Sequence, residues 1–157
     1  MPVIALITWV VAALGGLFLL AIWLIEYDPD FQRAAATRLP VPVVASHVLL
    51  AVGGLGVWVG YLITDTDSLA LIALVILGAV VLFGLTMAVR WIGVYRTRTV
   101  PVLVGGPGSG AGLGGHSVQI AVPPERHFPV SVVIAHGIFA FTTLVLVLLT
   151  VLGVGGS

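Results

Sequence analysis

Two histidines, His47 and His136, lie inside long apolar stretches of the sequence. Each follows, by seven residues, a proline at the start of its stretch (Pro40 and Pro129), which places it about 10 Å into a helix that rises about 1.5 Å per residue. An ionisable side chain at such a depth in a membrane is costly and indicates a functional site. Neutral imidazole binds transition metals and haem iron, and it also carries protons or bonds neighbouring helices.

The segments that must hold these histidines are strongly apolar. Of the 157 residues, 60% are hydrophobic and 8% are charged, and the mean hydropathy is +1.25. No soluble domain of this length can bury so much apolar surface. We expect one transmembrane domain, residues 1–157, whose helices lie at about 3–25, 41–63, 68–94 and 129–153, because a span needs roughly 20 apolar residues. The alternating pattern of barrel strands is missing, so helices are the expected spans.

The first apolar stretch is expected to be a helix and not a cleaved signal peptide. No Lys or Arg precedes it, it is longer than the apolar region of a signal peptide, and no small-residue cleavage site follows it.

Arginines indicate how the chain is oriented in the cell membrane. They occur in the two long connections and at the end of the third helix, namely at Arg33, Arg38, Arg90, Arg96, Arg98 and Arg126. The short turn between the second and third helices carries only Asp65 and Asp67. We therefore expect a multi-pass protein with both termini outside and both long connections cytoplasmic, including a Gly-rich loop at about 99–126.

An internal repeat relates the two halves of the chain. Residues of the first helix recur in the third at an offset of 68, as Gly16 and Gly84, Trp23 and Trp91, and Tyr27 and Tyr95. Residues of the second helix recur in the fourth at an offset of 89, as Pro40 and Pro129, and His47 and His136. The sequence thus predicts an all-α fold, an integral membrane four-helix bundle made of two parallel-repeat helical hairpins. The matched Trp and Tyr residues are interpreted as interfacial anchors.

In such a bundle the second and fourth helices stand diagonally, so the two histidines would face each other. Helical periodicity places small residues on each histidine's face: Ala51 and Gly54 beside His47, and Ala140 and Thr143 beside His136. Two imidazoles across a gap lined in this way suit a flat apolar cofactor, and haem is the obvious one. Cationic residues that would suit its propionates gather toward the cytoplasmic rim: Arg38, Arg90, Arg126 and His127.

In architecture the sequence resembles membrane-embedded b-type cytochromes, in which histidines on two transmembrane helices of a four-helix bundle hold the porphyrin. The resemblance covers the helical core and rests on His47, His136, Ala51, Ala140, Gly54 and Arg90. The familiar respiratory members carry two histidines on each ligand helix and two haems, whereas this chain has one histidine per helix. The resemblance therefore implies one haem b with bis-histidine ligation and electron transfer with quinone or a partner redox protein, without catalytic residues.

Two alternatives remain open: a non-catalytic membrane subunit whose histidines serve packing, and a small metal or proton transporter that uses the paired histidines. Copper transport is disfavoured, because the chain lacks cysteine and its only methionines are Met1 and Met87. Gly56 and Gly60 form a Gly-x-x-x-Gly pair nearly opposite His47, which is typical of close helix packing within the bundle or in a homodimer. The lipid bilayer is an expected partner of the chain, and nucleic acid is not.

Overall fold

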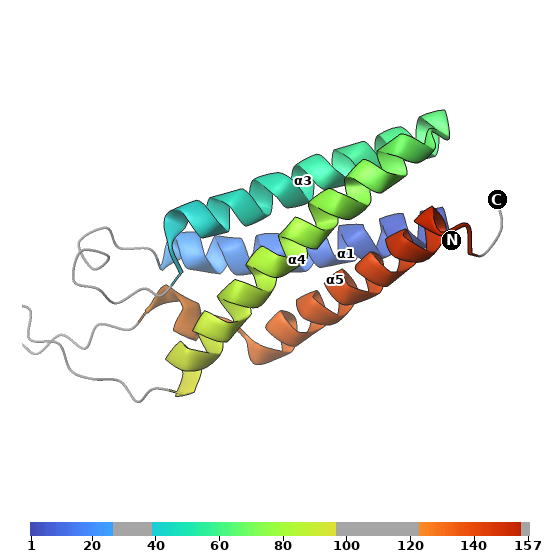
Figure 1. Ribbon diagram of the computed structural model, residues 1–157. Coiled ribbons are helices and arrows are strands. Elements are labelled where there is room, and N and C mark those ends of the chain that lie inside the picture. Colours follow the sequence, from blue (N-terminus) through green and yellow to red (C-terminus); the bar gives the residue numbers. More distant parts are fainter. Residues whose placement is uncertain (27–38, 97–122, 155–157) are drawn as a thin grey trace, which may run out of the picture.

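The computed structural model describes residues 1–26, 39–96 and 123–154, and in these ranges the chain is all-helical (Figure 1). Four long helices occupy the four apolar stretches: α1 (Pro2–Ile25), α3 (Val41–Thr64), α4 (Asp67–Arg96) and α5 (Val130–Val151). A 3-10 helix, η1 (Pro124–His127), precedes α5. All four long helices are sufficiently long and apolar to cross a membrane.

Two prolines mark the starts of α3 and α5, and one aspartate marks the end of α3. Pro40 and Pro129 are the N-cap residues of α3 and α5, and both have extended backbone, with φ of -63° and -64°. A proline is well suited to the start of a helix, because the helix makes no use of an N–H group there. At the other end of α3, Asp65 adopts the left-handed conformation with φ 51°, which Asp tolerates better than most residues. The chain therefore turns back at once, and α4 begins at Asp67.

The helices pack as two close pairs, α1 with α5 and α3 with α4. Contacts between α4 and α5 and between α1 and α3 are fewer, and α3 makes no close backbone contact with α5. The two histidine-bearing helices are therefore diagonal, as the sequence predicted (Figure 1). Each close pair joins one helix from each predicted hairpin.

A packed core fills the end of the bundle that holds the α3–α4 turn. Trp9 and Trp58 are its largest side chains, and Trp58 donates its indole N–H to the carbonyl oxygen of Pro2 at 3.3 Å. Small residues on the facing helices, Ala5, Ala70 and Ala73, are fully or almost fully buried against them. Large and small side chains thus interdigitate at this end, as close packing requires.

Gly54 belongs to this core. A Cβ atom at Gly54 would lie 2.9 Å from Cγ2 of Ile76 and 3.1 Å from Cζ2 of Trp9. The glycine therefore allows the Trp9 indole to lie against the backbone of α3.

The Gly-x-x-x-Gly pair does not pack as one unit within the described chain. Nothing in the described residues comes within 4 Å of a Cβ built on Gly56, whereas a Cβ on Gly60 would lie 3.6 Å from Leu69. Gly56 thus faces away from the bundle. A homodimer through this face stays a prediction.

We expect Gly54→Ala to destabilise the fold by about 1–3 kcal/mol, the usual range for overpacking a close-packed core. The matched control is Gly53→Ala, because a Cβ at Gly53 meets nothing within 4 Å and alanine favours a helix over glycine. Unfolding of the detergent-solubilised variants by heat or denaturant measures the difference. Equal stability of the two variants would contradict the packing role given to Gly54.

Candidate functional site

A cavity of about 380 Å³ lies among the four helices, next to the packed core. Its lining is apolar except for His47, His136 and the hydroxyl of Thr143. Toward the η1 end it is lined by Trp23 and Trp91. A cavity of roughly 300–1,000 Å³ with few polar groups is the usual form of a small-molecule or cofactor site.

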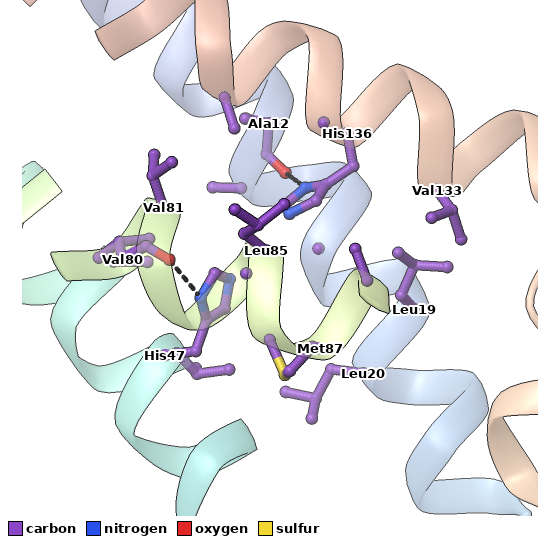
Figure 2. A pocket seen from close by; sticks show the side chains of 18 of the residues that line it. Ala12, Leu19, Leu20, His47, Val80, Val81, Leu85, Met87, Val133 and His136 are labelled. Atoms are coloured by element: carbon purple, nitrogen blue, oxygen red, sulfur yellow. Dashed lines mark hydrogen bonds between the residues drawn. The ribbon is translucent and has the colours of Figure 1, made fainter. Parts of the chain in front are cut away.

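Each close helix pair holds one histidine by a hydrogen bond across the pair (Figure 2). Nδ1 of His47 on α3 lies 3.0 Å from the carbonyl oxygen of Val80 on α4. Nδ1 of His136 on α5 lies 2.8 Å from the carbonyl oxygen of Ala12 on α1. Because a carbonyl oxygen only accepts, Nδ1 carries the proton and donates in both bonds.

The second nitrogen of each ring, Nε2, is directed into the space between the two rings (Figure 2). The ring centres of His47 and His136 are 6.3 Å apart, and the ring planes meet at 65°. In a neutral imidazole with its proton on Nδ1, Nε2 carries a free lone pair. Two such lone pairs therefore face the cavity from opposite sides.

The contacts of the two histidines follow the offsets of the predicted repeat. The acceptor carbonyls belong to residues 68 apart, Ala12 and Val80, and the histidines themselves are 89 apart. Most of the cavity lining consists of residues related by the same two offsets, among them Gly16 and Gly84, Leu19 and Met87, Trp23 and Trp91, Leu39 and Phe128, Val44 and Val133, and Ala51 and Ala140. The two sides of the cavity are thus lined by positions that correspond in the predicted repeat.

The small residues predicted beside the histidines have different surroundings. Ala51, Ala140 and Thr143 line the cavity, whereas Gly54 packs against Trp9 and is absent from the lining. The Thr143 hydroxyl is buried and lies 2.8 Å from the Phe139 carbonyl oxygen and 2.9 Å from the Thr8 hydroxyl. The bond with Thr8 joins α5 to α1, and the bond with Phe139 lies within α5.

The predicted rim cations lie outside the cavity lining. Arg90 is exposed near the end of α4, and Arg126 and His127 belong to η1. Nδ1 of His127 lies 3.9 Å from Oε2 of Glu26, at the end of α1. Arg38 lies outside the described residues.

Trp23 and Trp91 differ from their expected role as interfacial anchors. Both are buried, with exposed fractions of 5% and 9%, and both line the cavity. The Trp91 indole N–H donates to the carbonyl oxygen of Glu125 at 3.0 Å and so holds η1 against the end of the bundle. Tyr95 is exposed, as an anchor would be, and Tyr27 lies outside the described residues.

The histidine pair has no additional metal ligand nearby in the part of the chain that the structure describes. No group of three or more His, Cys, Asp or Glu side chains able to hold a metal ion occurs there. A bare metal ion would thus find two protein ligands at this site, fewer than the three or four of usual zinc sites.

Comparison of the chain with models of protein families, with curated proteins and with solved structures finds no match.

Proposed function

We propose that this chain is a membrane protein that holds one haem b between His47 and His136 and serves one-electron transfer. The observation that carries the proposal is the pair of Nε2 atoms directed into one apolar cavity, with both Nδ1 atoms already bonded to carbonyl oxygens.

The apolar outer surface of the bundle supports the proposal that the chain lies in a membrane. Large apolar side chains on all four helices are exposed, including Ile4, Leu49, Ile63, Val75 and Phe141, each more than half exposed. Soluble monomers rarely expose contiguous apolar patches beyond a few hundred square ångströms. Four helices of this length and hydropathy are compatible with a multi-pass membrane protein.

The distance between the imidazoles suits one metal ion held from both sides. A metal bound at about 2.0–2.1 Å from two opposed imidazole nitrogens separates the ring centres by about 6 Å. The separation here is 6.3 Å. Because the described residues offer two ligands, the bound group itself would have to supply the others, and a porphyrin carries four nitrogens that would do so.

The lining suits the flat body of such a group. Glycine and alanine stand at corresponding positions on the two sides, as Gly16 and Gly84, and Ala51 and Ala140. These residues leave room beside each imidazole without adding polar atoms. At the η1 end, the guanidinium groups of Arg90 and Arg126 and the imidazole of His127 would suit propionates.

The residues of the site would then act in three ways. The hydrogen bonds from Nδ1 fix the orientation of each imidazole and raise the basicity of Nε2 as a ligand. The apolar lining would keep water away from the haem, and His47 and His136 would both hold it. When bound, haem supplies reversible one-electron chemistry at its iron. Because His47 and His136 would both be engaged in holding the haem, the arrangement favours electron transfer, with quinone or a partner redox protein as the proposed exchange partner.

We expect the purified chain, expressed with haem available, to show the intense optical spectrum of a low-spin haem that shifts on reduction and does not change with carbon monoxide. His47→Ala and His136→Ala should each lose the low-spin spectrum, because either change removes one axial ligand. Any haem that they retain should bind carbon monoxide. His116→Ala, which changes a histidine outside the described residues, is the control.

A colourless preparation would overturn the proposal and favour the alternatives, a non-catalytic membrane subunit or a metal or proton transporter. A full low-spin spectrum in one of the two alanine variants would remove that histidine as a ligand.

Arg90→Gln should lower the midpoint potential of the haem by tens of millivolts, because a nearby positive charge favours the reduced, less positive iron. A redox titration beside the parent measures the shift. The control is Arg96→Gln, which removes the same charge from the same helix at its last residue. An unchanged potential with full haem content would leave Arg90 as an interfacial anchor.

The predicted orientation can be tested because the chain contains no cysteine. Thr66→Cys, in the α3–α4 turn, should react with a membrane-impermeant maleimide added to intact cells. Tyr95→Cys, near the other end of α4, should react only after the membrane is opened, since the positive-inside rule places that end in the cytoplasm. The reverse labelling pattern would overturn the orientation.

A further inference from the structure

Each carbonyl that accepts a histidine bond is followed, four residues later, by a glycine. Gly16 follows Ala12, and Gly84 follows Val80. A Cβ built on Gly16 would lie 3.0 Å from Cε1 of His136, and one built on Gly84 would lie 3.2 Å from Cε1 of His47. Both distances are shorter than nine in ten real contacts of a Cβ atom.

Helix geometry explains why the glycine stands at this spacing. In an α-helix the carbonyl of residue i accepts from the N–H of residue i+4, and the side chain of residue i+4 leans back over the preceding turn. That side chain therefore covers the outer side of the carbonyl. A glycine leaves the carbonyl open, and its second lone pair can accept a further bond from a neighbouring helix.

We infer that Gly16 and Gly84 are positioning residues that let the backbone carbonyls of Ala12 and Val80 hold both histidines with the proton on Nδ1. The carbonyl thereby selects the tautomer, and Nε2 becomes the ligand atom directed into the cavity. The inference deepens the proposed function and rests on it for the role of Nε2.

The atoms around Gly16 and Gly84 distinguish this positioning role from ordinary helix packing. The atoms nearest to the missing Cβ belong to the imidazole ring in both cases: Cε1, Nδ1 and Nε2 of His136 at Gly16, and Cε1 and Nδ1 of His47 at Gly84. At Gly15 the nearest atom is Cβ of His136 at 3.6 Å, an ordinary contact, and at Gly78 nothing lies within 4 Å. A side chain at Gly16 or Gly84 would thus displace an imidazole before it met anything else.

The test uses the full-length chain in detergent, without haem, labelled with ¹⁵N at histidine. Chemical shifts of the ring nitrogens report which one carries the proton, and His→Gln variants assign the signals. We expect His47 and His136 to carry the proton on Nδ1. Gly16→Val should abolish this state for His136 and leave His47 unchanged, and Gly84→Val should do the reverse.

Milder variants keep the test decisive if valine prevents folding. Gly16→Ala requires the ring to move by a few tenths of an ångström, and Gly84→Ala by less, so the change in the ¹⁵N shifts should be larger for Gly16→Ala. Gly15→Ala and Gly78→Ala raise helix propensity in the same way and should leave both tautomers as they are. Unchanged shifts in both Gly16→Ala and Gly84→Ala, with the fold intact, would overturn the inference.

Haem binding provides a separate readout. Loss of a hydrogen bond that orients a metal-ligating histidine typically weakens metal binding by about 10- to 100-fold, and we expect a loss of that size for Gly16→Val and Gly84→Val. If the parent chain shows the Nδ1–H tautomers but binds no haem, the proposed function fails and the inference about the glycines stands. If haem binds equally to the parent and to both valine variants, the inference fails and the proposed function stands.

Discussion

The hydrogen bonds from the two histidines to backbone carbonyls are the constraint on which the site depends. His47 belongs to the first predicted hairpin and bonds to Val80 in the second, whereas His136 belongs to the second and bonds to Ala12 in the first. Each histidine is therefore held by a carbonyl of the other predicted hairpin. In an apolar interior a buried N–H group without an acceptor is costly, so these two bonds also fix the register of α3 against α4 and of α5 against α1. A slide of either pair by one residue would lose the carbonyl that the imidazole requires.

The rest of the bundle has two parts: a packed core that holds the helices together, and a cavity lined by small and apolar residues. At the end with the α3–α4 turn, Trp9 and Trp58 fill the interior, and Gly54 admits the edge of Trp9. Toward the other end, Gly16 and Gly84 keep side chains away from the imidazoles, and the cavity lies between the two close pairs. Glycine thus makes room for a neighbouring side chain at both levels. At Gly54 it makes room for a tryptophan, and at Gly16 and Gly84 it makes room for an imidazole ring against a carbonyl.

Much of this arrangement could be predicted from the sequence. The contacts between helices could not, for a physical reason. The apolar stretches predicted four helices, and the offsets of 68 and 89 paired His47 with His136. Helical periodicity, however, relates residues only within one helix. It grouped Gly54 with His47, seven residues away, although two turns separate them and Gly54 lies in the packed core. Contacts between helices, such as His136 with Ala12, depend on a register that the sequence of one helix does not contain.

Differences between the two sides of the cavity show which positions the geometry restricts most. The histidines and the glycines at 16 and 84 are the same residue types on both sides, as are the alanines at 51 and 140. Other corresponding positions differ in volume: Trp9 corresponds to Leu77, Leu20 to Ala88, and Val48 to Gly137. Apolar lining tolerates changes of volume when neighbouring side chains compensate, whereas a donor, an acceptor and the gap between them tolerate very little. The histidines and the glycines beside their rings are thus the same on both sides, whereas the pairs that differ in volume only fill space.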